Sequence, residues 1–184
     1  MKKIILSLLC LTFSITLFAQ KTLPEIKDGT TLKCSAYVQG QEFPLDLTLK
    51  SIAGPVTMLW AVEGYGDGAF VMSTKALENA TQMYVTTQPA TGETKLSDSE
   101  TFGMISKVAY KALAETKTLT YGGIKFKLKT PDANPMKING KEIDATHVVS
   151  EDGKLELWVL NNPNLPLVLQ SAGFPTDIVV IEIK

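Results

Sequence analysis

Alternation of apolar and polar residues is the dominant pattern in this chain, and it predicts β-strands. In residues 43–50 every second residue is Phe or Leu, and the residues between them are Pro, Asp, Thr and Lys. Residues 30–38 and 56–63 show the same period of two. Successive side chains of a strand point to opposite faces, so these segments predict strands with one face in the core.

The C-terminal segment predicts an antiparallel meander. Short turn signals such as Asp152-Gly153 and Asn161–Asn164 separate its extended segments, whereas parallel strands need long crossovers. The predicted strands of this meander are Ile143–Val149, Lys154–Leu160, Leu165–Ser171 and Asp177–Lys184.

One main amphipathic helix is predicted at residues 98–115. Ser97 and Glu100 have the spacing of a capping box, in which each side chain satisfies a free backbone N–H. The apolar residues that follow recur at helical spacing and predict one buried stripe: Phe102, Ile105, Val108, Ala109, Ala112 and Leu113. The expected fold class is therefore α+β, mostly antiparallel β, with a strongly curved sheet or open barrel on which this helix packs.

Shorter elements are predicted around the main helix. Ser73 is in position to cap a short helix at Thr74–Ala80, and Gln82–Thr87 has the composition of a strand. Gly122-Gly123 and Asn139-Gly140 each predict a tight hairpin turn.

The N-terminus has the pattern of a secretory signal peptide. A basic Met1–Lys3 start precedes the apolar run Ile4–Phe18, and Ala19 provides a small residue for cleavage. The prediction is a signal peptide at 1–19 and a single β-rich domain at 20–184, exported by a bacterium to the periplasm or beyond. After cleavage no apolar run is long enough for a membrane span.

Composition argues against two classes of partner. All 18 basic residues are lysines, and they nearly balance the 19 acidic residues. Without arginine the chain lacks the planar side chain that binds phosphates and guanine bases in a bidentate manner, so nucleic acid is not an expected partner. Cys34 would be the one cysteine left after cleavage, on an apolar strand face, and is predicted to be a buried structural thiol.

No motif of a catalytic or metal centre is present. His147 is the only histidine, and it lies in a strand pattern without a nucleophile elbow or a metal-binding spacing. Glu156 and Glu182 are expected at the surface. We therefore predict a protein that is not an enzyme, with no catalytic residue, metal or cofactor.

Apolar residues also occur where alternation calls for polar ones, and two interpretations are open. In the first, a second layer covers them and the core is an ordinary filled one. In the second, a curved sheet encloses an apolar groove. The candidate lining residues of that groove are Met58, Trp60, Phe70, Met72 and Trp158.

The run Leu157-Trp158-Val159-Leu160-Asn161-Asn162-Pro163, with Pro166-Leu167 after it, resembles the periplasmic lipoprotein-carrier-like proteins. Those proteins are incomplete β-barrels in which helices plug an apolar groove. The carriers place an arginine in or near the groove and this chain has none, so the resemblance implies the fold and the class of ligand only.

Two functions are expected on these grounds. The first is an exported, non-enzymatic protein that binds a lipid or another apolar small molecule in its groove. The alternative is an envelope or secreted module that binds another protein and has a filled core.

Overall fold

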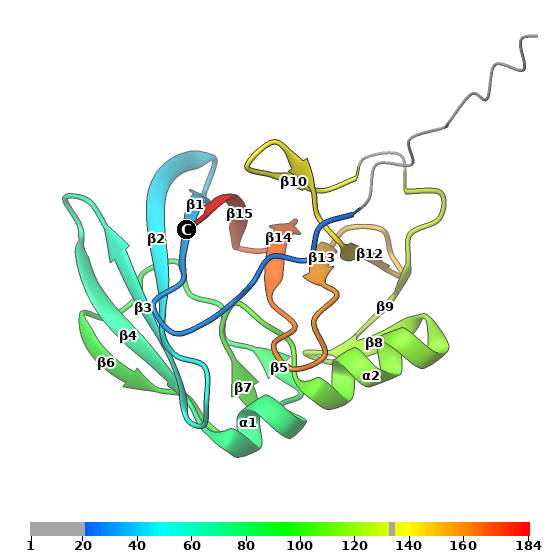
Figure 1. Cartoon of the computed structure of the whole chain (residues 1–184), viewed down its shortest axis with the longest axis horizontal. Coiled ribbons are helices and arrows are strands. Elements are labelled where there is room, and N and C mark those ends of the chain that lie inside the picture. Colours follow the sequence, from blue (N-terminus) through cyan, green and yellow to red (C-terminus); the bar gives the residue numbers. More distant parts are fainter. Residues whose placement is uncertain (1–20, 133–134) are drawn as a thin grey trace, which may run out of the picture.

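A single 11-stranded sheet dominates the computed structural model, which describes residues 21–132 and 135–184 (Figure 1). All neighbouring strands of this sheet are antiparallel except β4 and β6, so the predicted, mostly antiparallel β fold is confirmed. The order is linear, with β6 and β8 at its two edges. Side by side, the strands are β6 (Gly92–Lys95), β4 (Gly66–Met72), β3 (Val56–Val62), β2 (Gln41–Ser51), β1 (Thr31–Val38), β15 (Thr176–Ile183), β14 (Val168–Ala172), β13 (Glu156–Leu160), β12 (Ala145–Ser150), β9 (Ile124–Leu128) and β8 (Thr118–Tyr121).

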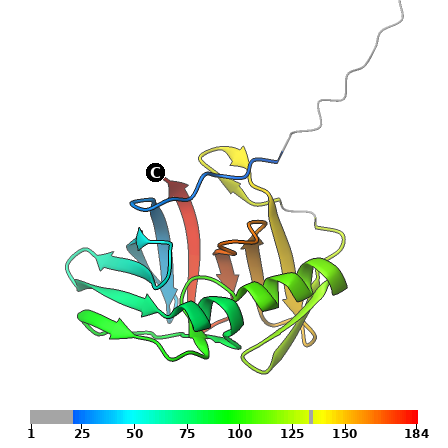
Figure 2. The same cartoon turned by 60° about the horizontal axis from the view of Figure 1, so that its bottom comes forward.

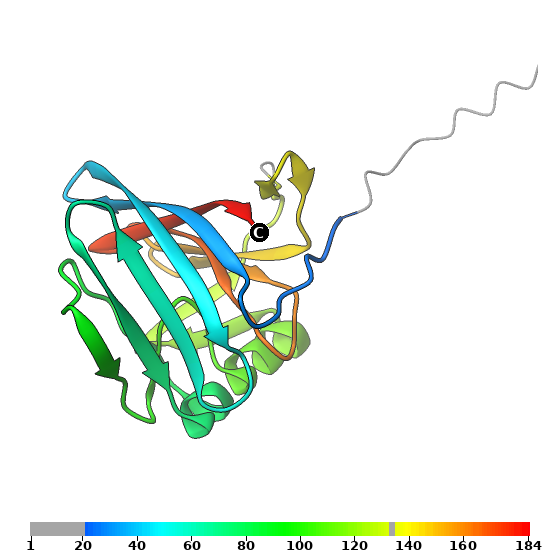
Figure 3. The same cartoon turned by 60° about the vertical axis from the view of Figure 1, so that its left-hand side comes forward.

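Two small sheets and two helices complete the described part of the chain. The small sheets pair β10 (Lys137–Ile138) with β11 (Lys141–Glu142), and β5 (Gln82–Met83) with β7 (Glu100–Thr101). The helices are α1 (Thr74–Asn79) and α2 (Lys107–Thr116). They lie next to each other, in front of the strands in Figure 2 and at the bottom of the molecule in Figure 3.

Short turns build the large sheet from two meanders. Strands β1 to β4 follow one another in sequence, and so do β12 to β15, which confirms the predicted C-terminal meander. The turns at Gly122-Gly123 and Asn139-Gly140 form the expected hairpins, and Asn139 has the positive φ of 52° that such a turn requires. Strand β15 then pairs with β1 and joins the two meanders.

The main helix begins later than the sequence indicates. The predicted helix at 98–115 is reduced to α2, which starts at Lys107. Ser97 does bond to Glu100, through its hydroxyl at 2.7 Å and its N–H at 3.3 Å. These bonds close a turn before β7, so the capping-box prediction was wrong about the start of the helix.

Contacts with distant segments explain this later start. The Tyr121 hydroxyl is hydrogen bonded to Thr101 Oγ1 at 2.6 Å and accepts the N–H of Ser106 at 3.2 Å. The Ser106 hydroxyl donates to the carbonyl oxygen of Ala80 and accepts the N–H of Ala109, so that Ser106 becomes the N-cap. The bonds to Tyr121 of β8 and to Ala80, the C-cap of α1, thus hold the residues just before Ser106 in an extended path.

The apolar stripe of the helix is correspondingly shorter. Ala109 and Leu113 are buried in α2, and Phe102 and Ile105 reach the core from the segment before the helix. Val108, which the helical spacing placed inside, is 57% exposed. The short helix predicted at Thr74–Ala80 is present as α1 (Thr74–Asn79). As expected, Ser73 caps it, because its side chain accepts the N–H of Ala76.

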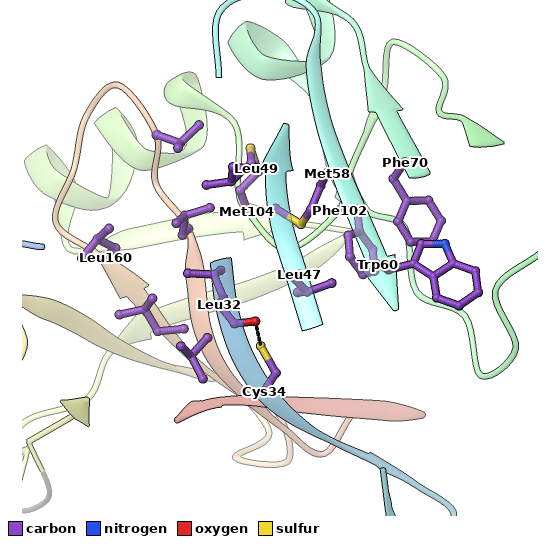
Figure 4. Packing of buried hydrophobic residues seen from close by; sticks show 14 of the residues in the cluster. Leu32, Cys34, Leu47, Leu49, Met58, Trp60, Phe70, Phe102, Met104 and Leu160 are labelled. Carbon is purple, nitrogen blue, oxygen red and sulfur yellow. Dashed lines mark hydrogen bonds between the residues drawn. The ribbon is translucent and has the colours of Figure 1, made fainter. Parts of the chain in front are cut away.

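Two groups of buried side chains form the core. One lies beneath α2, between the helix and strands β8, β9, β12, β13 and β14. The other lies along the inner faces of β1 to β4 and continues to the C-terminal strands (Figure 4). Cys34 belongs to the second group and is 4% exposed, as predicted. Its Sγ faces the Leu32 carbonyl oxygen, and burial, aided by the charge of Asp46, raises the pKa of the thiol to about 12.

The predicted signal peptide, Met1 to Ala19, lies outside the described residues. Within those residues, no helix has both the length and the apolar character needed to cross a bilayer.

Cys34 is expected to remain unmodified by iodoacetamide in the native protein at about pH 8, because its thiol is buried and stays protonated. Peptide mapping by mass spectrometry should find Cys34 alkylated only after unfolding in urea. Alkylation of native protein at the unfolded rate would contradict this assignment.

The same burial predicts a loss of stability in alkali. The unfolded thiol ionises near its ordinary pKa of 9.0, while the folded thiol stays neutral up to about 12. The unfolded state therefore binds fewer protons in this window, and stability falls as the pH rises. The difference in urea midpoint between the wild type and Cys34→Ala should shrink from pH 8 to about pH 10.

Candidate functional site

An apolar groove opens at one end of the N-terminal meander. Its volume is about 150 Å³, and no charged side chain lines it. The lining residues come from β1, β2, β3, β4, β15 and the loops beside them: Ala36, Val38, Phe43, Leu45, Trp60, Val62, Tyr65, Phe70, Thr86, Thr87, Pro89, Phe102, Thr176 and Ile178.

Strand alternation places these side chains on one face. Ala36 pairs with Phe43 across β1 and β2, and it pairs with Ile178 across β1 and β15. All three residues therefore point to the same side of the sheet, as the period of two requires.

Trp60 is the largest residue of the groove, and a glycine makes room for it. Trp60 is paired with Gly68 on β4, and a Cβ atom at Gly68 would lie 2.7 Å from Trp60 Nε1 and 2.5 Å from the carbonyl oxygen of Gly92. Trp60 is 1% exposed, and its Nε1 has no hydrogen-bond partner among the described residues. Because the indole packs closely against Gly68 of β4, its Nε1–H group is left without a hydrogen-bond partner among the described residues.

Gly68→Ala is expected to lower the free energy of unfolding by about 1–3 kcal/mol, because the added methyl group would overlap the indole and a backbone oxygen. Urea unfolding followed by tryptophan fluorescence measures the change. Asp67→Ala, at the exposed neighbouring position, is the control and should leave the midpoint nearly unchanged. Equal midpoints for the two variants would contradict the tight packing of Trp60.

A strap of residues 84–89 covers one side of the groove. Sequence analysis placed a strand at Gln82–Thr87, but only Gln82–Met83 form one, and the residues after them leave the sheet. Thr176 Oγ1 donates to the Thr86 carbonyl oxygen at 2.9 Å, and the Tyr65 hydroxyl reaches the Pro89 carbonyl oxygen at 3.4 Å. These bonds hold the strap to β15 and to the turn between β3 and β4.

A second, smaller cavity of about 50 Å³ continues the groove beneath the strap. It shares four lining residues with the groove: Thr86, Phe102, Thr176 and Ile178. The two spaces are therefore adjacent.

The groove has an opening, which we call its mouth. The exposed fraction of the lining side chains indicates where it lies. Leu45, Trp60 and Phe70 are buried at its inner end. Phe43, beside the turn between β1 and β2, and Tyr65, in the turn between β3 and β4, are 37% and 46% exposed. The groove thus opens where β1 meets β2 and β3 meets β4.

The predicted lining residues occupy three different places. Trp60 and Phe70 line the groove, with Phe102 packed on Phe70 at a ring separation of 4.2 Å (Figure 4). Met58 and Met72 are fully buried behind it and do not reach its surface.

Trp158, the fifth predicted residue, lies in another depression, where its ring stacks on His147 at 3.7 Å. Sequence reasoning also missed several lining residues. The alternation of β2 could have identified Phe43, whereas nothing in the local pattern marks Thr86, Thr87 or Pro89.

His147 is the centre of a charged cluster on β12, β13 and the segment that follows β9. It is 4% exposed, with Nδ1 3.1 Å from Asp132 Oδ1 and Nε2 2.6 Å from Glu156 Oε2. Lys129 Nζ donates to both oxygens of Glu156, at 2.8 and 2.9 Å. Glu156 was predicted to be a surface residue; its side chain is partly buried, at 23% exposure, and is paired with both Lys129 and His147.

The geometry of this cluster supports a structural role. Both ring nitrogens of His147 face carboxylate oxygens, so neither is left for a hydroxyl nucleophile or a metal ion. Among the described residues, no three His, Cys, Asp or Glu side chains are grouped so that they could hold a metal. The hydrogen bond from Lys129 holds the pKa of Glu156 below its ordinary value against the opposing effect of burial, and the bond with His147 adds to the lowering.

Glu156→Gln is expected to destabilise the fold by about 1–2 kcal/mol near neutral pH, because a paired and partly buried charge is lost. A depressed folded pKa contributes stability above the unfolded value of 4.5, and this contribution disappears as the pH falls through the folded pKa. The urea midpoints of the wild type and the variant should therefore converge at acid pH.

Glu182→Gln provides the control for this experiment. Glu182 pairs with Lys184 at 3.1 Å, and both side chains are well exposed. The control should stay within about 0.5 kcal/mol of the wild type at every pH. Parallel pH curves for the wild type and Glu156→Gln would contradict the role of Glu156.

Comparison of the chain with known protein families, with curated proteins and with solved structures gave no match.

Proposed function

We propose that this chain is an exported, non-enzymatic binding protein that holds the acyl chain of a lipid, or a similar apolar ligand, in its groove. The observation that carries the proposal is the groove itself, which is open at one end and lined without any charged residue. Pockets that bind small molecules are concave and mostly apolar, with a few polar groups. Here the lining residues with hydroxyl groups are Tyr65, Thr86, Thr87 and Thr176.

The size of the groove sets what it can hold as it stands. A cavity of about 150 Å³ takes an apolar body about as large as benzene, which corresponds to the end of an acyl chain. A longer segment needs the second cavity as well, and this lies directly beneath the strap. We therefore expect the strap to move when a full chain enters.

The proposed architecture is an open barrel. The 11 strands follow a linear order in which β6 and β8 remain unpaired with each other, while β15 closes the join between the two meanders. The groove then lies between the inner faces of β1 to β4 and the strap. Export, which rests on the signal-peptide pattern of residues 1–19, would give such a protein access to envelope lipids.

The direct test is a search for bound lipid. Protein purified from the exported fraction should release an acyl-chain lipid into organic solvent in about one equivalent or less, as seen by mass spectrometry. In parallel, isothermal titration calorimetry should detect binding of dodecyl maltoside below its micelle concentration.

Ala36→Leu is expected to weaken binding of dodecyl maltoside at least about tenfold, because the larger side chain fills the groove. Ala61→Leu, at an exposed position of β3 outside the lining, is the matched control and should bind as the wild type does. Thermal unfolding of both variants shows whether each is folded. Absence of lipid together with no binding by the wild type would overturn the proposed function.

A further inference from the structure

Strand β8 forms one edge of the large sheet, and part of its backbone is free there. β8 pairs with β9 across a two-residue turn, and the Leu128 N–H donates to the Lys117 carbonyl oxygen. Antiparallel strands alternate between residues whose backbone groups face the partner strand and residues whose groups face away from it. Counting from Lys117, the N–H and C=O groups of Thr118 and Thr120 therefore point outward from the sheet edge.

Little of this edge is occupied by other segments. The outward N–H of Gly122 donates to the Thr81 carbonyl oxygen at 2.6 Å. The Thr116 hydroxyl donates to the Thr118 carbonyl oxygen at 3.2 Å. The N–H groups of Thr118 and Thr120 and the Thr120 carbonyl oxygen have no bonding partner in the described part of the chain. Edge strands that resist pairing carry charges or proline, whereas β8 has the sequence Thr-Leu-Thr-Tyr.

A depression runs along this free edge, between β8 and α2 (Figure 1). Its volume is about 310 Å³, and it shares no lining residue with the groove. Four of its lining side chains are apolar: Val108, Ala109 and Ala112 of α2, and Leu119 of β8. Val108 is 57% exposed, so an apolar surface is open to a partner here. A strand placed beside β8 would direct every second side chain to this side of the sheet.

The other face of β8 carries positive charge. In the β8–β9 register, Thr118 is paired with Lys127 and Thr120 with Lys125. Paired residues share a sheet face, so both exposed lysines lie on the face away from α2. Lys125 is paired with Glu151 at 3.0 Å, whereas Lys127 has no ion pair among the described residues. Acidic side chains of an added strand would therefore be attracted to this face.

We infer that the edge of β8 binds an extended, acidic peptide segment of another protein, which adds one antiparallel strand to the sheet. Strand addition is an established mode of peptide recognition, in which backbone bonds give affinity and alternate side chains give specificity. The apolar side chains of the peptide lie in the depression beside α2, and its acidic side chains lie beside Lys125 and Lys127. This inference is independent of the groove.

A second copy of the chain fits this edge less well than a peptide does. Two β8 strands offer only four residues each, which limits the backbone bonds between them. Their pairing would also place two lysine rows on one face of the joined sheet.

A capped hexapeptide that alternates valine and glutamate, acetyl-(Val-Glu)3-amide, is the probe for this edge. Amide hydrogen exchange followed by NMR reports on individual N–H groups. In the free protein, the N–H groups of Thr118 and Thr120 should exchange quickly because they have no partner. With the peptide bound, their exchange should slow at least about tenfold. The exchange of Gly122, which is already bonded, should change little.

Matched peptides test how the probe binds. In an antiparallel pair, the residue opposite Thr118 or Thr120 exchanges both backbone bonds with it and points its side chain to the same face. The N–H groups that β8 needs therefore belong to the glutamates. Methylation of the glutamate nitrogens should abolish the protection, and methylation of the valine nitrogens should leave it unchanged. At low salt, a peptide with lysine in place of glutamate should bind at least about fivefold more weakly.

Variants of the protein test the same contacts. Thr120→Pro removes one outward N–H and leaves the β8–β9 ladder intact, because proline is tolerated at such edge positions. This variant should lose the peptide-dependent protection of Thr118. Lys127→Gln should weaken binding of the glutamate peptide, whereas Lys50→Gln, at an exposed position of β2, is the control and should not. Thermal unfolding shows whether each variant is folded.

Three outcomes would overturn the inference. The first is a wild-type protein in which millimolar glutamate peptide leaves the exchange of Thr118 and Thr120 unchanged. The second is equal protection by the two methylated peptides. The third is protection that needs no peptide and rises with protein concentration, which would assign the edge to a second copy of the chain. None of these results bears on lipid binding in the groove.

Discussion

The pairing of β1 with β15 is the interaction on which the rest of the structure depends. It runs from Leu32 beside Ile183 to Val38 beside Thr176, and it turns two separate meanders into one sheet. It also brings Ala36 next to Ile178, so that the groove has a wall from each end of the chain. The longest strands are thereby kept in the interior of the sheet, and only the four-residue strands β6 and β8 remain as edges, which limits edge-to-edge association.

The apolar groove and the ionic cluster lie in different halves of this sheet. The N-terminal half surrounds the groove, where packing leaves Trp60 Nε1 unpaired and where no charge lies inside. In the C-terminal half, ionic hydrogen bonds among Lys129, Glu156 and His147 join strands β12 and β13 to the segment that follows β9. The groove and the ionic cluster thus consist of different residues.

Local patterns predicted the features that depend on nearest neighbours, such as the meanders and the glycine turns at Gly122-Gly123. Local patterns gave the wrong start for the main helix, because that start depends on contacts distant in sequence. The Tyr121 hydroxyl bonds to the segment before α2 and keeps it from forming a helix despite its helical spacing. Of the five predicted lining residues, Trp60 and Phe70 do line the groove: Trp60 follows the alternation of its strand, whereas Phe70 was named because it is apolar where alternation calls for a polar residue. The strap has no periodic pattern, and the partners of His147 lie on other segments, so neither could be derived from sequence spacing.

The bond from Thr176 to the strap has a kinetic consequence for the proposed function. Thr176 is the first residue of β15, so the strap is hydrogen bonded directly to the strand that joins the two meanders. Under the proposed function, a ligand that reaches the second cavity beneath the strap would leave it only after this bond breaks and the strap lifts. Residence time would then be governed by the strap, and affinity by the apolar lining.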